Sequence, residues 1–266
     1  EHTGRYFNHN VHSVRVLDDM VNWNISLQTL DGILCHNGEL ELKEYRPCEM
    51  STFVEYDKKV EACYVDEKAI GELIPCTLEG CVMRICDIIA YLGKDRQDAM
   101  RLNLLKESPF TAGAIGTSNG EIINNFSVNI IENSYGKDYL KMDEEYFDAL
   151  RQAKKENYEM IYNNKSLNDL YENEIRPMFG ELYEELLRQA ESGDKSSVFY
   201  RHHMAYMEKN NFYVKSHVRK PYAEQEKNQL VVDYLASMTD DYFIALYHYL
   251  FPKGKHDVKF VGYFDL

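Results

Sequence analysis

The chain has 266 residues, 44% of them hydrophobic and 28% charged, so it is long enough to bury one large core or two smaller ones. Its formal net charge of −14 disfavours binding to nucleic acid and to anionic membrane surfaces. No apolar run approaches the roughly 20 residues that span a bilayer, and no charged leader followed by an apolar stretch opens the chain. We therefore expect a cytoplasmic protein that does not contact membranes.

Helical periodicity dominates the sequence. Two helices are predicted within residues 9–35, with Asn24 or Ser26 capping the second. Residues 37–73 are charged and uneven, and we expect them to be partly helical. A long central helix follows Thr77, its predicted cap, and continues to Leu105. Further helices are predicted over residues 121–134, 143–162, 167–191, 196–209 and 224–250.

Strand and loop signals are few. Residues 107–120 carry dense Gly, Ser and Pro and predict a loop, which lacks the G-x-x-x-x-G-K-[ST] pattern of a phosphate loop. Residues 259–264 could form a short strand, and period-two alternation is scarce elsewhere. The predicted class is all-α, mostly helical, with at most a few short strands. The six cysteines form no C-x-x-C pair and are expected to be reduced thiols.

One face of the central helix carries polar side chains among apolar neighbours. Asp87, Tyr91, Asp95 and Asp98 are spaced at i, i+4, i+8 and i+11, so all four project from one face. We expect Asp87 to be buried, because nearly every neighbour is apolar. A buried carboxylate is paired, protonated or bound to a metal, and pairing with Arg84 is the alternative to a metal-binding role.

Four blocks of sequence, in the same order and with similar spacing, resemble the HD-domain deoxynucleoside triphosphate triphosphohydrolases. The blocks are Tyr6-Phe-Asn-His9-Asn with Ser13 and Arg15, Leu27 to Gly38, Cys86 to Ala99, and Asp233 to Asp240. They extend over nearly the whole chain. The resemblance implies an HD-domain-like helical bundle, of which residues 1–105 are the C-terminal part of the catalytic core. Residues 106–266 are then a helical region packed on that core as one structural unit.

The resemblance also assigns roles on the central helix and at the first block. Asp87 corresponds to the last metal ligand of the family. Tyr91 corresponds to the tyrosine that packs against the substrate sugar and phosphate, and Asp95 to the acid that holds the sugar 3′-hydroxyl. His9 corresponds to the histidine that faces the α-phosphate, where it would orient water or protonate the leaving group.

A later stretch is similar to the family's phosphate-binding and base-stacking residues. Arg151 and Lys154 are the candidate phosphate-binding cations, and Tyr158 is the candidate base-stacking side chain. A nucleoside triphosphate carries about four negative charges, so cations of this kind suit it. The expected partner is a deoxynucleoside triphosphate, and a homo-oligomer is also expected.

The implied activity is metal-dependent hydrolysis of a deoxynucleoside triphosphate, dGTP-like, to a deoxynucleoside and triphosphate. The divalent metal would be Mn, Mg, Fe or Zn, which carboxylate and imidazole ligands do not distinguish. The family's His-Asp pair precedes the first block, and here the only His-Asp dipeptide is His256-Asp257, in the tail. We therefore expect either a fragment without the full metal site or a protein that has lost it.

Two other function classes fit the same residues. One is a non-catalytic nucleotide-binding or regulatory helical module, which keeps the sugar pocket without a competent metal site. The other is an oligomerisation domain built on the aromatic segment that begins at Asp240. Among the remaining histidines, His36 is expected at a helix C-terminus, and the adjacent His202 and His203 are expected at the surface.

Overall fold

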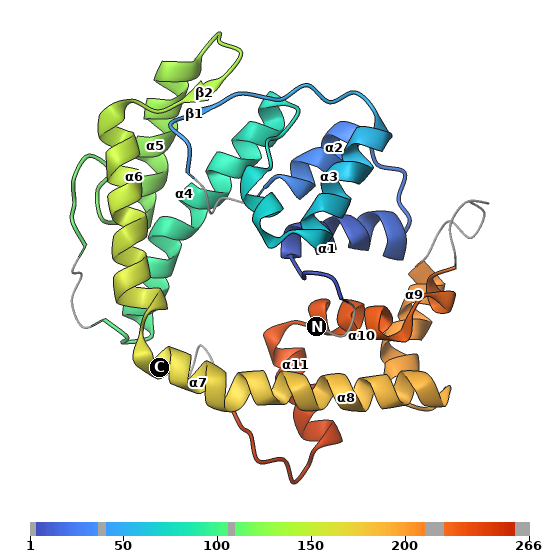
Figure 1. The fold of residues 1–266 in the computed structure, drawn as a ribbon. Helices are drawn as coiled ribbons and strands as arrows, with labels where there is room; N and C mark the ends of the chain where they lie inside the picture. Colours follow the sequence, from blue (N-terminus) through green and yellow to red (C-terminus); the bar gives the residue numbers. More distant parts are fainter. Residues whose placement is uncertain (1–3, 37–40, 106–109, 211–220, 259–266) are drawn as a thin grey trace. The chain divides into compact units, whose positions relative to one another are not determined.

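The computed structural model of the protein describes residues 4–36, 41–105, 110–210 and 221–258. Within these residues it contains eleven α-helices and a single two-stranded sheet (Figure 1). This confirms the predicted mostly helical fold. None of the described helices is long and apolar enough to cross a bilayer. The strand predicted for residues 259–264 lies outside the described residues.

The chain folds into two compact units. The central-helix unit comprises residues 5–14 and 25–164, and the C-terminal unit comprises residues 1–4, 15–24 and 165–266. The change of unit thus falls at 164/165, whereas the division predicted from the sequence lies at 105/106. The functional assignment of those two predicted parts stays a prediction.

The central-helix unit is built mainly around one long helix, α4. Helices α2, α5 and α6 contact α4, and α3 contacts α2 (Figure 1). Strands β1 and β2 pair antiparallel, with Tyr45 opposite Leu140. The elements are α2 (Leu27–Leu34), β1 (Glu44–Tyr45), α3 (Phe53–Val65), α4 (Leu78–Arg101), α5 (Asn119–Ser134), β2 (Leu140–Lys141) and α6 (Glu144–Asn157). The short helix α1 (His9–Arg15) adds Val11 and Val14 to the cluster of α2 and α3.

The start and the end of α4 follow from local chemistry. The Thr77 side chain accepts a hydrogen bond from the Gly80 amide at 3.0 Å, so the predicted cap is confirmed. The helix ends at Arg101 rather than at Leu105, because Asn103 adopts φ +54° and an asparagine tolerates this left-handed conformation. Its buried face packs against α5 and α6 through Ile85, Ile88, Ile89 and Leu92, which with Phe126 and Leu150 belong to one core cluster.

Gly93 allows the close approach of α4 and α5. A methyl group at this position would lie 2.7 Å from the Cα of Asn119 and 2.6 Å from its Oδ1. We expect Gly93→Ala to destabilise the chain by about 1–3 kcal/mol, because the clash is with backbone. The control is Gly180→Ala in α8 (Arg176–Ser192), where a methyl group meets nothing within 4 Å and should stabilise by about 0.5–1 kcal/mol. Urea unfolding measures both, and equal effects would contradict the packing argument.

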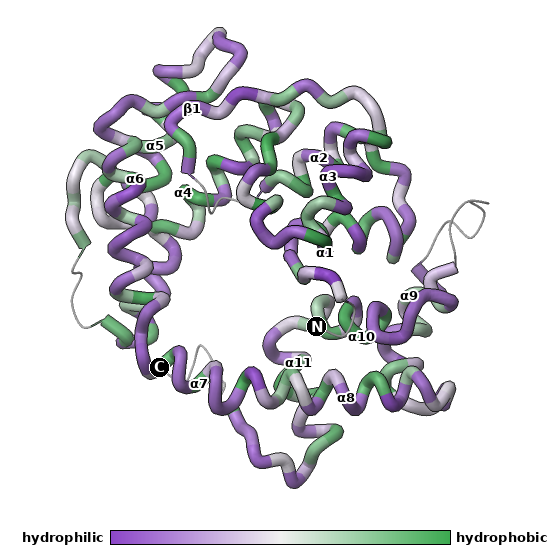
Figure 2. The backbone as a smooth tube through the Cα atoms, viewed as in Figure 1, coloured by the Kyte–Doolittle hydropathy of each residue, from purple (hydrophilic) through white to green (hydrophobic). Residues whose placement is uncertain are grey.

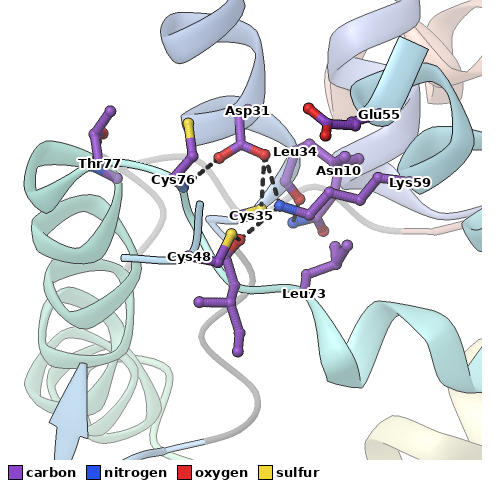
Figure 3. A network of polar contacts seen from close by, with 12 residues as sticks. Asn10, Asp31, Leu34, Cys35, Cys48, Glu55, Lys59, Leu73, Cys76 and Thr77 are labelled. Carbon is purple, nitrogen blue, oxygen red and sulfur yellow. Dashed lines mark hydrogen bonds and ion pairs between the residues drawn. The ribbon is translucent and has the colours of Figure 1, made fainter. Parts of the chain in front are cut away.

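A buried carboxylate ties α2, α3 and the start of α4 together. Figure 3 shows Lys59 and the Cys76 backbone converging on Asp31, whose two oxygens accept from Lys59 Nζ and Cys76 N, each at 2.6 Å. Lys59 Nζ also donates to the Ile74 carbonyl at 2.6 Å. The neighbouring Cys35 thiol is buried, which raises its pKa to about 12 and keeps it protonated. All six cysteines are free, as predicted.

The C-terminal unit has its own core, formed along α8. Its elements are η1 (Val16–Met20), α7 (Lys165–Leu170), η4 (Tyr171–Ile175), α8, η5 (Phe199–Met204), α9 (Ala205–Asn210), η6 (Tyr222–Glu224), α10 (Lys227–Ala236) and α11 (Asp240–Leu250). The single segment predicted for 224–250 is divided, because the Thr239 side chain accepts from Tyr242 N and caps a new helix. Core side chains include Met178, Leu182, Phe199, Leu230 and Tyr247.

A buried polar network lies within this unit. Asp233 is fully buried and accepts from Arg15 Nε and Nη2, each at 2.7 Å, and from the Tyr222 hydroxyl at 3.0 Å. Tyr222 in turn lies 2.7 Å from His203 Nε2. The prediction that His203 lies at the surface is therefore wrong. It is only 3% exposed, because adjacent residues of a helix point in different directions and His203 faces the buried Tyr222, whereas its neighbour His202 is exposed as expected.

Candidate functional site

The polar face predicted on the central helix is present. Asp87, Tyr91, Asp95 and Asp98 all lie on α4 and all are partly exposed, while Ile88 and Leu92 between them are fully buried. The expected burial of Asp87 is therefore wrong, because its helical position directs it to the edge of the core rather than into it. A half-exposed carboxylate is open to a ligand without the cost of burying a charge.

Pairing between Asp87 and Arg84 is not observed. Arg84 is buried and donates to the Leu73 carbonyl, with its guanidinium 6.0 Å from the Tyr45 ring. Among the described residues, Asp87 makes no hydrogen bond or ion pair. Asp98 forms an exposed ion pair with Lys94 at 2.5 Å, which fits the solvated face of a helix.

Three other predicted site residues lie at the end of α6. Hydrophilic residues dominate this helix in Figure 2, with acidic side chains in its first turn and Lys154 and Lys155 in its last. Such a distribution complements the helix dipole, which gives both lysines a structural reason to be there. The chain then continues as a π-helical turn, η3 (Tyr158–Tyr162), a geometry that is frequent at functional sites.

Arg151, Lys154 and Tyr158 line a common pocket of about 500 Å³. The remaining lining residues are Glu41, Asp148, Gln152 and Lys155. Tyr158 is 61% exposed, so its ring is accessible to a ligand. A pocket of this size with several cations and an accessible aromatic ring suits an anionic ligand with a planar group.

A tyrosine that the sequence reasoning missed connects this pocket with α4. The Tyr162 hydroxyl donates to Asp95, and the Tyr162 ring meets that of Tyr158 edge to face at 6.2 Å. Burial, and then the hydrogen bond to Asp95, raise the pKa of Tyr162 above its usual value. The available signal was its spacing, since Tyr162 follows Lys154 and Tyr158 at intervals of four residues.

A buried arginine fixes the end of α6 against α4. Arg96 donates to Asn157 Oδ1 at 2.7 Å and to Glu156 Oε2 at 3.1 Å, and it is only 2% exposed. Asn157 also donates to the Leu92 carbonyl at 3.0 Å. These buried contacts position the turn from which Tyr158 and Tyr162 project. The array formed by Asp95, Tyr158 and Tyr162 is therefore held in place by buried as well as surface side chains.

His9 lies at the start of α1, away from α6 and the pocket (Figure 1). It is the first residue of α1, it is exposed, and its ring lies 5.2 Å from that of His36, edge to face. His36 Nδ1 lies 2.6 Å from the Ile33 carbonyl, close to the end of α2, as predicted. His9 is not among the residues that line the pocket. Its catalytic role stays a prediction.

The residues that the structure describes do not form a complete metal centre. Over the described ranges, no group of three or more His, Cys, Asp or Glu side chains is placed to hold an ion. Asp87 would supply one carboxylate ligand, and a protein metal site needs several. The described residues alone therefore do not fit the metal that the resemblance implies.

Part of the chain matches a family of domains that is associated with phosphohydrolases. Residues 140–249, which include the pocket helix α6 and most of the C-terminal unit, match the family model described as a phosphohydrolase-associated domain. No solved structure matches the chain.

Three of the curated relatives that match the chain bear the name deoxyguanosinetriphosphate triphosphohydrolase-like protein. The one from Caldanaerobacter subterraneus subsp. tengcongensis is 27% identical over 66% of this chain and 47% of its own length. The one from Clostridium tetani is 25% identical over 93% and 60%, and that from Clostridium perfringens strain SM101 is 26% identical over 89% and 58%. The chain thus spans about half to three fifths of the length of these relatives. The comparisons confirm the resemblance to the dGTPase-like HD phosphohydrolases, at low identity.

Proposed function

We propose that this chain is part of a deoxynucleoside triphosphate triphosphohydrolase and that α4, α6 and η3 together bind the nucleotide. The observation that carries the proposal is the connection of Asp95 to Tyr162, whose ring meets Tyr158 in the pocket. Two separate stretches of sequence, both assigned to the substrate by resemblance, therefore supply one continuous array. The names of the three relatives support dGTP as the substrate.

Each residue has a role that its chemistry suits. Arg151 and Lys154 bind the phosphates, since charge-assisted hydrogen bonds from guanidinium and ammonium groups are strong. Tyr158 stacks on the base through its exposed ring. Asp95 and Tyr91 hold the sugar, with Asp95 accepting from a hydroxyl group. Tyr162 orients the Asp95 carboxylate through the hydrogen bond that its hydroxyl donates.

The proposal is tested with the full-length protein, supplied with Mn²⁺ or Mg²⁺ and each deoxynucleoside triphosphate in turn. We expect release of inorganic triphosphate. We expect Asp87→Ala and Asp95→Asn each to lower kcat/KM by at least about a hundredfold, because the resemblance makes Asp87 a metal ligand and Asp95 the group that orients the sugar. Asp98→Asn is the control, because Asp98 pairs with Lys94 on the exposed side of the same helix. Unchanged turnover in the Asp87 and Asp95 variants would remove the proposal.

The same assay separates the alternative classes. Nucleotide binding without triphosphate release would indicate the non-catalytic nucleotide-binding module instead. Absence of binding, together with loss of self-association on changing the exposed Tyr249 of α11, would indicate the oligomerisation domain. The homo-oligomer and the cytoplasmic location remain predictions.

A further inference from the structure

The acidic side chain of Glu41 forms ion pairs with two cations of the pocket. Glu41 forms an ion pair with Lys154, and its Oε1 lies 3.9 Å from Arg151 Nε. The Glu41 and Lys154 side chains are only 22% and 20% exposed, so most of the surface of this ion pair is shielded from solvent. The two residues that the proposed function assigns to the phosphates therefore share one carboxylate.

Among the charged residues that line the pocket, Glu41 is the acid that pairs with Arg151 and Lys154. The lining includes three cations, Arg151, Lys154 and Lys155, and two acids, Glu41 and Asp148. Lys155 instead pairs with Glu159 at 3.9 Å, on the exposed side of the helix. Burial raises the pKa of Glu41, but hydrogen bonds from Lys154 and from its own backbone outweigh this and lower it, so Glu41 is ionised at neutral pH.

We propose that Glu41 is an internal competitor for the phosphates, holding Lys154 and Arg151 until a polyphosphate displaces it. This rests on the proposed function, because it assumes that these cations bind the substrate. A triphosphate carries several charges against the single charge of Glu41 and can exchange with it. Orthophosphate carries between one and two negative charges near neutral pH and binds the two cations more weakly, so it displaces Glu41 only at higher concentrations than a triphosphate does.

A purely structural ion pair would behave differently. If Glu41 served only to attach its segment to α6, Glu41→Gln would lower the free energy of unfolding and would leave anion affinity unchanged or weaker. A competitor predicts the opposite for affinity, because removing the carboxylate takes away a negative charge that competes with the anion for both cations.

The experiment is a calorimetric titration of the chain with inorganic tripolyphosphate at low ionic strength, where charge interactions are least screened. We expect Glu41→Gln to bind about tenfold more tightly than the wild type, which is the effect of removing one nearby charge at a partly exposed site. Lys154→Ala should bind about tenfold more weakly. Orthophosphate should bind the wild type at least tenfold more weakly than tripolyphosphate, and Glu41→Gln should tighten the binding of both anions.

The matched control is Glu144→Gln, which removes the same charge from an exposed pair with Lys43 outside the pocket lining. Equal tightening by Glu41→Gln and Glu144→Gln would assign the effect to net charge and overturn the inference. So would unchanged or weaker binding by Glu41→Gln with a wild-type melting temperature, or no binding by any variant. Hydrolysis by the Asp87 and Asp95 variants of the full-length protein is a separate readout, so the proposed function can hold while the role of Glu41 fails.

Discussion

Replacing Asp233 by alanine is expected to lower the free energy of unfolding by about 3–5 kcal/mol. The carboxylate is fully buried and accepts from Arg15, Tyr222 and Gln229, at 2.7 Å, 3.0 Å and 2.9 Å. Its removal takes the buried counter-ion from Arg15, whose side chain is only 10% exposed. Urea unfolding followed by circular dichroism measures the loss.

Two control variants make this result specific. Glu172→Ala breaks an exposed ion pair with Arg176 in the same unit and should change the unfolding free energy by less than about 1 kcal/mol. The double variant Arg15→Met with Asp233→Leu replaces both charges by apolar groups and should recover much of the loss. A small effect of Asp233→Ala would show that the network contributes little to stability.

Lowering the pH from 6.5 to 4 is expected to cost the folded chain about 3 kcal/mol through His203 alone. Burial lowers the pKa of His203 from 6.5 to about 4, against an opposing effect of Asp233. Because the folded pKa is depressed, the unfolded chain binds the proton first as the pH falls. The contribution is therefore fully present above pH 6.5, decreases below it, and is lost by about pH 4.

The variant His203→Gln isolates this contribution from that of the carboxylates. The amide can still donate to the Tyr222 hydroxyl but does not titrate, so its stability should fall less steeply between pH 6.5 and 4. His202→Gln changes the adjacent exposed histidine and should keep the wild-type slope. Identical slopes for wild type and His203→Gln, measured by urea unfolding at several pH values, would contradict the depressed pKa.

Much of the local structure could be predicted from the sequence. The cap at Thr77, the cap at Ser26 and the shared face of Asp87, Tyr91 and Asp95 are all found. These features depend on residues within a few turns of one another, where spacing and side-chain chemistry suffice. The helix-end errors have local causes as well, as at Asn103, where one left-handed residue stops α4.

The candidate site could be predicted only in part. Arg151, Lys154 and Tyr158 do line one pocket, but its acidic member Glu41 and its link to α4 through Tyr162 were not predicted. Both involve contacts between residues far apart in the chain, and a single sequence carries no signal for such pairs. The expected burial of Asp87 was wrong because apolar neighbours in sequence do not show how far the adjacent helices cover a given face.

The sequence by itself determined a helical protein with an HD-type resemblance, because apolar spacing and short motifs act over one or two turns. The tertiary structure decided which charges meet. It placed Asp31 against Lys59, Asp233 against Arg15, and Glu41 against Lys154. It also buried His203, which its position beside an exposed histidine did not reveal. The physical reason is that a charge is buried only where folding brings its partner from elsewhere in the chain.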